Sequence, residues 1–166
     1  DTSDIITEDK KGNLQLDYKR FVDAFAETNR LVYCHGMFYT PDGAVSSQSV
    51  RRDIANTLGD MGWKSRLDVP TNSLFISLKD MYQIDELEVD ENVIPVSNGD
   101  LHIKKNQWEF RLGEKKQAPY RLSVRYTPVS RPTPLFDKWL EDVFAPEDIP
   151  VIQEIMGYCL VPLTSA

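Results

Sequence analysis

Hydrophobic residues in the first half of the chain recur with helical spacing. Tyr18, Phe21, Val22 and Phe25 occupy positions i, i+3, i+4 and i+7, and they follow Asp17, a residue type that caps helix N-termini. Two further stretches have the same period: Val50, Ile54, Leu58 and Met61 after Ser46 or Ser47, and Leu74, Phe75, Leu78, Met81 and Tyr82 after Pro70. The pattern therefore predicts three helices, the third of which follows Pro70 with Thr71 or Asn72 as its cap.

Short runs of residues with high β propensity lie between the first two predicted helices. Residues 31–34 and 37–40 are separated by His35-Gly36 and followed by Pro41-Asp42-Gly43, a strong turn signal. These residues predict a small antiparallel sheet.

The period changes to alternation after residue 92. Residues 93–96 and the pair Leu101 and Ile103 flank Asn98-Gly99, which tolerates the positive φ angles of a two-residue turn. Alternation continues through Trp108, Phe110 and Leu112, and then through Tyr120, Leu122, Val124 and Tyr126 with Arg121, Ser123 and Arg125 between them. We expect three or four antiparallel strands, with the arginines on an open face and the aromatic residues in the core rather than stacked on bases.

The last third of the chain returns to helical spacing. Thr133 followed by Pro134 is a helix start, and the expected buried stripe is Phe136, Trp139, Leu140 and Val143. A second helix has Pro150 in its first turn, and its residues expected to pack inward are Ile152, Ile155, Met156, Cys159 and Leu160. The predicted fold is α+β: a helical and β-hairpin subdomain over residues 1–83, then an antiparallel β-sheet and two C-terminal helices over 84–166.

Charge is segregated along the chain, although the net charge is −7. Residues 101–131 carry eight basic and two acidic side chains, whereas six acids and no base lie in 84–100. Local positive charge favours contact with phosphates, while a solvated sheet face is the alternative. The candidate DNA-binding residues are Arg51, Arg52, Lys104, Lys105, Lys115, Lys116, Arg121 and Arg125.

Motifs that would indicate catalysis or metal binding are missing from the sequence. Cys34 and Cys159 are far apart in apolar surroundings, which predicts free buried thiols, and the two histidines lack neighbours at zinc-ligand spacing. Phosphate-binding glycine loops and a Gly-x-Ser-x-Gly elbow do not occur. We therefore expect no catalytic residue, no metal site and no cofactor in this chain, and the absence of a long apolar run predicts a cytoplasmic protein without a membrane segment.

The second half resembles the phage and plasmid primase–helicase family that is related to satellite-phage and poxvirus primase–helicases. The motifs that carry the resemblance are Asn98-Gly99-Asp100-Leu101, the run 120–128, Phe136-Asp137-Lys138-Trp139-Leu140 and Gly157-Tyr158-Cys159-Leu160. The first half is similar to the poxvirus-type amino-terminal accessory domain of the same proteins, through residues 18–25, 37–43 and 50–58.

This resemblance implies an accessory region in front of a superfamily 3 helicase ATPase domain that would lie beyond residue 166. Such a region would serve as a collar or linker that supports hexamer assembly and guides DNA, while the parent protein, encoded by a bacterial prophage or plasmid, would use ATP and Mg²⁺. Its implied partners are DNA, the ATPase domain and neighbouring subunits.

Two alternatives stay open at this point. One is a prophage regulatory module that binds another protein through the acidic C-terminal helices. The other is a metal-dependent nuclease or primase remnant that uses the acids of residues 85–91, of which Glu88 and Asp90 are the nearest approach to a two-metal carboxylate pair.

Overall fold

The computed structural model describes residues 5–105, 107–128 and 132–160, which form two compact units. The first unit contains the chain up to Glu88 together with Gln117–Tyr120, and the second contains Val89–Lys116 and the chain from Arg121 onward. Each unit is described by itself below. The division into the two predicted subdomains, 1–83 and 84–166, stays a prediction.

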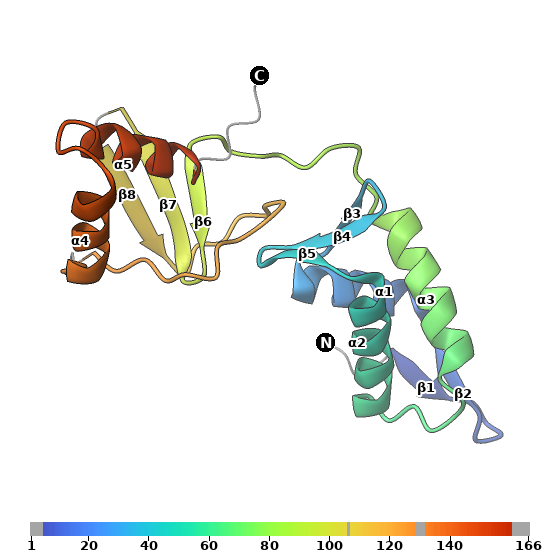
Figure 1. Cartoon of the computed structure of the whole chain (residues 1–166). Coiled ribbons are helices and arrows are strands. Elements are labelled where there is room, and N and C mark those ends of the chain that lie inside the picture. Colours follow the sequence, from blue (N-terminus) through green and yellow to red (C-terminus); the bar gives the residue numbers. More distant parts are fainter. Residues whose placement is uncertain (1–4, 106, 129–131, 161–166) are drawn as a thin grey trace. The chain divides into compact units, whose positions relative to one another are not determined.

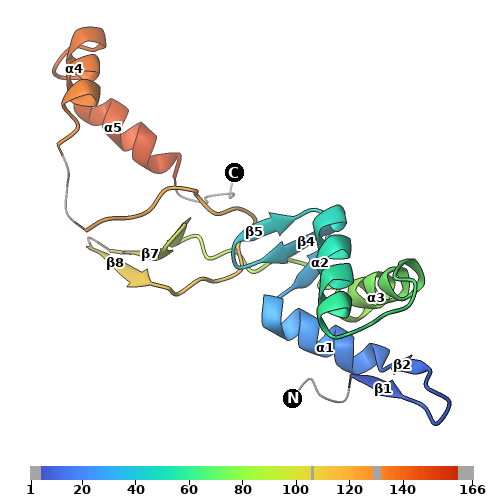
Figure 2. The same ribbon diagram turned by 90° about the horizontal axis from the view of Figure 1, so that it is seen from below.

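The first unit combines three helices with two small antiparallel sheets (Figure 1). Its elements are β1 (Ile6–Glu8), β2 (Leu14–Leu16), α1 (Tyr18–Asn29), β3 (Val32–Cys34), β4 (Met37–Thr40), β5 (Gly43–Val45), α2 (Ser47–Asp60) and α3 (Asp68–Met81). The strands β1 and β2 form a hairpin, and β3, β4 and β5 form a sheet in that order. Helices α2 and α3 pack side by side (Figures 1 and 2).

Local capping explains where the first two helices begin. The side chain of Asp17 accepts a hydrogen bond from the Arg20 amide (3.1 Å), and Ser46 Oγ accepts one from the Ser49 amide (3.1 Å). Both contacts satisfy backbone donors that the first helical turn leaves without partners. Both predicted helix starts are therefore confirmed.

The predicted start of the third helix is wrong. Helix α3 already begins at Asp68, so Pro70 lies inside its first turn, and Thr71 and Asn72 are helical residues rather than caps. Proline is tolerated there because amides of the first turn have no intrahelical acceptor, so that a missing N–H costs no hydrogen bond.

Two hairpin turns depend on residues with positive φ. The β3–β4 turn consists of His35 (φ 46°) and Gly36 (φ 84°), the backbone pattern of a type I′ hairpin, as the His35-Gly36 spacing predicts. The β1–β2 hairpin was not predicted from the sequence. Its signal is Gly12 (φ 81°), which lies in the turn between residues 8 and 14.

The core of the first unit is formed by the inward faces of its helices and by Phe38 of β4. Buried residues of this core are Ile5, Phe21, Val22, Phe25, Ala26, Leu31, Phe38, Val50, Ile54, Leu58, Leu74, Phe75 and Leu78. The ring of Phe38 packs against those of Tyr33 and Phe75, with centroids 4.9 and 5.5 Å away. The three predicted apolar stripes therefore meet in one core, except that Tyr18 of α1 and Met81 of α3 are exposed.

The second unit contains a three-stranded antiparallel sheet and two helices. Its elements are β6 (Val93–Val96), β7 (Gly99–Lys104), β8 (Gln107–Leu112), α4 (Pro134–Val143) and α5 (Ile149–Tyr158). The strand order is β6-β7-β8. The predicted α+β fold, with hairpins, an antiparallel sheet and C-terminal helices, is confirmed.

Gly99 is a strand residue rather than a turn residue. Because Val96 pairs with Gly99, the two-residue connection is Ser97-Asn98, and the predicted Asn98-Gly99 turn is wrong by one residue. A Cβ atom at Gly99 would lie 2.3 Å from the carbonyl oxygen of Arg111 on β8. Glycine is therefore required here for the close approach of two strands.

The sheet has three strands, the lower of the two numbers predicted, and the described residues after β8 do not form a fourth. Residues 121–126 contribute a single bridge, between Val96 and Leu122. Beyond that bridge, the side chain of Asn98 donates to the Tyr126 carbonyl and accepts from the Tyr126 amide, both at 2.9 Å. The segment is thus held by the β6–β7 turn instead of by a regular ladder.

The two faces of the sheet differ in polarity, as the alternation predicts. Ile94, Leu101 and Phe110 pair across the strands on one face, with Leu122 and Tyr126 packed against the same cluster. Trp108 is an exception to the predicted aromatic core, because it is 65% exposed and contacts Tyr126 edge-on. It lies near the start of β8, opposite Ile103.

The start signals of the last two helices are confirmed, but their predicted burial is wrong. Helix α4 begins at Pro134 and α5 at Ile149, with Pro150 in the first turn. Leu140 is the buried residue of α4, whereas α5 has none, and Cys159 is exposed while Cys34 is buried. Periodicity identifies the apolar face of a helix without showing what covers it. None of the helices in the described part of the chain has the length and apolar content that a membrane span requires.

Candidate functional site

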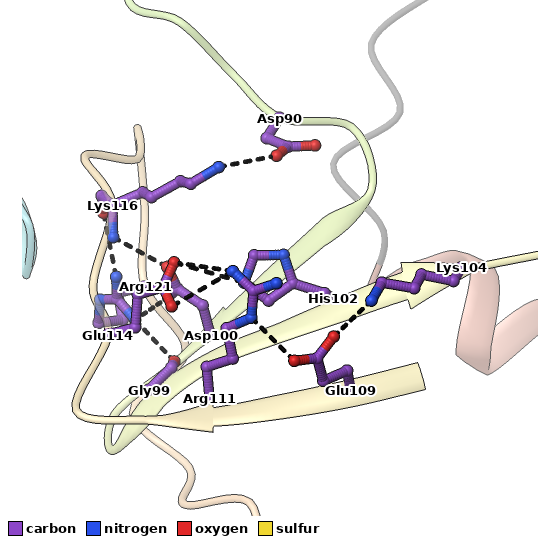
Figure 3. Close-up of polar contacts among 10 residues, drawn as sticks. All are labelled: Asp90, Gly99, Asp100, His102, Lys104, Glu109, Arg111, Glu114, Lys116 and Arg121. Carbon is purple, nitrogen blue, oxygen red and sulfur yellow. Dashed lines mark hydrogen bonds and ion pairs between the residues drawn. The ribbon is translucent and has the colours of Figure 1, made fainter. Parts of the chain in front are cut away.

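A buried ion pair lies at the centre of the polar face of the sheet. The carboxylate of Asp100, on β7, is fully buried, and the side chain of Arg121 is 4% exposed. Arg121 Nη1 contacts Asp100 Oδ1 at 2.8 Å (Figure 3). Taking two charges out of water is costly unless each finds further hydrogen bonds.

The remaining hydrogen bonds of this pair hold the segment that follows β8. Arg121 also donates to the carbonyl oxygens of Val96 (2.8 Å), Gly99 (2.9 Å) and Lys116 (3.1 Å). Asp100 Oδ2 accepts from the Lys116 amide at 2.8 Å. The pair therefore fastens the chain around residues 116 and 121 to the β6–β7 turn, which is a structural role.

Exposed charges around this centre are also paired. Glu109 contacts both Lys104 and Arg111, and hydrogen bonds from these two side chains lower the pKa of Glu109 from 4.5 to about 2. The same carboxylate raises the pKa of Arg111. Lys116 Nζ lies 3.1 Å from Asp90 Oδ2, and this hydrogen bond is the main cause of a lowered pKa at Asp90 (Figure 3).

His102 lies on β7 beside these charged side chains. Its Nε2 atom is buried and has no hydrogen-bond partner among the described residues. Its Nε2 atom lies 3.8 Å from Glu114 Oε1, which is too long for a hydrogen bond, and makes no other polar contact within the described part of the chain. Glu114 is already engaged by Arg111 at 3.3 Å.

The cluster is electrically balanced, since Asp90, Asp100, Glu109 and Glu114 face Lys104, Arg111, Lys116 and Arg121. General acid–base catalysis needs carboxyls whose pKa values are driven apart, whereas the shifts resolved in this cluster at Asp90 and Glu109 are both downward. Within residues 5–105, 107–128 and 132–160, no three His, Cys, Asp or Glu side chains are arranged to hold a metal ion. The arrangement holds the segment that follows β8 in place.

Three of the six basic residues predicted to bind DNA through the sheet form ion pairs with acidic side chains. Arg121 is buried, so the prediction that it lies on an open face is wrong, because its guanidinium group is needed to neutralise Asp100. Lys104 and Lys116 are exposed but paired. Lys105 and Arg125 are exposed, and Lys115 is half-buried. The DNA contacts themselves stay a prediction.

The basic residues predicted on the second helix have different surroundings. Arg52 is exposed beside Ser49 and Asp53. Arg51 is half-buried, and its guanidinium carbon lies 3.9 Å above the centre of the Phe75 ring. Lys79 of α3, which the sequence interpretation did not select, contacts the same ring at 4.9 Å.

Apolar side chains are exposed along both C-terminal helices. By helical spacing Phe136, Trp139 and Val143 share one face of α4, and Val151, Ile155 and Tyr158 share one face of α5. These six residues, termed here the α4–α5 apolar faces, are between 42% and 64% exposed. Monomeric proteins rarely expose so many large apolar side chains together without a partner.

Comparison with known proteins relates part of the chain to a protein family. A family model described as "D5 N terminal like" matches residues 72–145, from within α3 to just after α4. This match supports a relationship to the N-terminal region of phage and viral primase–helicases of the D5 type. The comparison with curated proteins found no significant match, and neither did the comparison with solved structures.

Proposed function

We propose that this chain is a non-catalytic accessory region of a mobile-element DNA primase–helicase, in which it supports assembly of the motor as a collar or linker. The match over residues 72–145 carries the proposal. The motor would be a superfamily 3 ATPase that uses ATP and Mg²⁺ and works as a hexamer, and DNA would be a further partner.

The α4–α5 apolar faces support an assembly role. Six large apolar side chains are exposed on these two ten-residue helices. A partner that covers them would stabilise the complex by about 25 cal/mol for each Å² of apolar surface removed from water. Acidic residues accompany them, since residues 132–166 carry six acids and one base. A partner surface with an apolar centre and a basic rim would fit both features.

The paired carboxylates on the sheet support a non-catalytic role. Asp90, one of the acids of the nuclease alternative, is held by Lys116, and Asp100 is held by Arg121. Acids engaged in this way hold neighbouring segments of the chain in place, which is a structural role.

Sedimentation velocity tests the proposal with the cognate ATPase region, ATP and Mg²⁺. We expect a larger fraction of hexamer when the wild-type chain is present, and a smaller fraction when the chain carries Trp139→Ser and Ile155→Ser. Ile76→Ser with Leu112→Ser is the matched control, because both side chains are exposed (49% and 74%) and lie outside α4 and α5. Equal assembly with and without the chain would exclude the collar role. Loss of assembly with this control variant would exclude the two apolar faces as its cause.

A further inference from the structure

Two cationic side chains of the first unit share one buried aromatic ring. The guanidinium carbon of Arg51 lies 3.9 Å from the centre of the Phe75 ring, and Lys79 Nζ lies 4.9 Å from the same centre. The Lys79 ammonium also lies 5.0 Å from the ring centre of Tyr33. Because both distances are measured to the centre of the same Phe75 ring, the charged groups of Arg51 and Lys79 lie close to each other.

Neither cation is neutralised within the described residues. Arg51 Nη1 donates to the amide oxygen of Asn72 at 2.8 Å, a neutral acceptor, and Lys79 forms no ion pair in the part of the chain that the structure describes. The contrast with the sheet is direct, because Lys104, Lys116 and Arg121 each contact a carboxylate. Positive charge that is free to meet an external anion thus lies on α2 and α3.

The two side chains are held in place before any ligand arrives. Asn72, Phe75 and Lys79 follow one another at i, i+3 and i+7 along one face of α3, and Arg51 reaches across from α2. Phe75 is only 3% exposed, so the platform is fixed by the core. Cation–π contacts restrict both side chains, which reduces the conformational entropy that binding would cost.

An open groove adjoins Arg51. It has a volume of about 570 Å³ and is lined by residues of α2 and of the N-terminal half of α3, including Thr71, Asn72 and Ser73. The acid on its wall, Asp68, is paired with Arg66 at 2.6 Å. The groove thus lies beside an arginine whose charge is not compensated within the described residues.

We propose that Arg51 and Lys79 form a binding site for the phosphate groups of a DNA strand. This inference rests on the proposed function, because an accessory region of a primase–helicase would work beside DNA. Each strand of a duplex carries one phosphate per about 3.4 Å of helix axis, so two cations gathered around one ring can contact neighbouring phosphates of a single strand. A phosphate also relieves the repulsion between the two like charges.

Fluorescence anisotropy of a labelled oligothymidylate of about 20 nucleotides tests the site with the 166-residue chain at several salt concentrations. For Arg51→Gln with Lys79→Gln, we expect roughly tenfold weaker binding at low salt, and a slope of log K against log salt that is smaller by about 1.4, the value for two lost contacts with a single strand. The charge-conserving pair Arg51→Lys with Lys79→Arg should keep the wild-type slope.

Lys19→Gln with Lys64→Gln is the matched control, since it removes two exposed charges from the same unit. Failure of the wild-type chain to bind at low salt would overturn the proposal, and so would equal changes in slope for the two double variants. Equal affinity for a polyglutamate peptide would also contradict it, because the site would then select acidic protein rather than phosphate. If the Arg51 and Lys79 double variant unfolds, Lys79→Gln alone should still lower the slope by about 0.7. Assembly measured by sedimentation is independent of this result, so that the two proposals can fail separately.

Discussion

Replacement of Arg121 by methionine would leave the Asp100 carboxylate buried without its cation. Asp100 is fully buried and Arg121 is 4% exposed, so water cannot take the place of the guanidinium group without opening the loop. Removing one partner of a buried pair costs about 3–5 kcal/mol. The carbonyl oxygens of Val96, Gly99 and Lys116 would lose donors as well. We therefore expect Arg121→Met to lower the unfolding free energy of the second unit by about 4 kcal/mol.

Urea unfolding followed by tryptophan fluorescence measures this loss. In a Trp63→Phe background the signal comes from Trp108 and Trp139, both in the second unit, and a loss of about 4 kcal/mol would move the midpoint by about 2 M. Lys104→Met is the control, because that side chain is 59% exposed and its pair should contribute less than about 1 kcal/mol.

The double variant Asp100→Leu with Arg121→Met should lose less than Arg121→Met alone, since no charge is left buried. Equal midpoints for Arg121→Met and Lys104→Met would refute the structural role of the buried pair. So would a loss at Arg121 that 1 M salt abolishes, because salt screens exposed pairs much more than buried ones.

Three further results are expected. Gly99→Ala should destabilise the second unit by about 1–3 kcal/mol, because its Cβ would meet the Arg111 carbonyl oxygen, whereas Gly59→Ala in α2 has free space and should stabilise by about 0.5–1 kcal/mol; urea midpoints check both. The ion pairs of Glu109, whose pKa is about 2 in the fold against an ordinary 4.5, should stabilise the protein above about pH 4.5 and lose this effect as the pH falls toward 2. Stability measured over that range should therefore fall less in Glu109→Gln than in wild type. Ile54→Ala should cost about 2–5 kcal/mol in thermal or urea unfolding of the first unit, because Ile54 is fully buried in its core.

Elements specified by neighbouring residues could be predicted from the sequence. Asp17 and Ser46 cap α1 and α2 through amides three residues away, and His35-Gly36 sets the β3–β4 turn by its own backbone angles. The starts of α4 and α5 likewise coincide with Pro134 and Pro150 in their first turns. In each case the physical cause lies within one helical turn.

Features that depend on distant residues could not be predicted. Arg121 belongs to an alternating stretch that points to an exposed strand, but the burial of Asp100 draws its side chain inward. The alternation around Leu122 is real, yet Asn98 takes the backbone groups of Tyr126 that a ladder would need. A count of basic residues likewise does not reveal which of them already have acidic partners.

The same limit applies to the candidate sites. Arg51 was selected because it lies on the polar face of a predicted helix, whereas Lys79 has no signal beyond its charge until α2 and α3 are packed against each other. Ile155 belongs to an apolar stripe with correct helical spacing on α5, but its side chain is exposed instead of buried. Periodicity predicts that such a face needs a partner, and the partner need not belong to the same unit.

Hydrogen exchange of the amides in α4 and α5 tests the central proposal most directly. In the chain alone, helices with uncovered apolar faces should open readily, so that their amide hydrogens exchange fast. Binding of the ATPase region to these faces should slow that exchange. We predict that addition of the cognate ATPase region, with ATP and Mg²⁺, protects the amides of residues 136–158, and that Trp139→Ser with Ile155→Ser abolishes this protection. Unchanged exchange of both helices in the presence of an assembled ATPase would contradict the collar role.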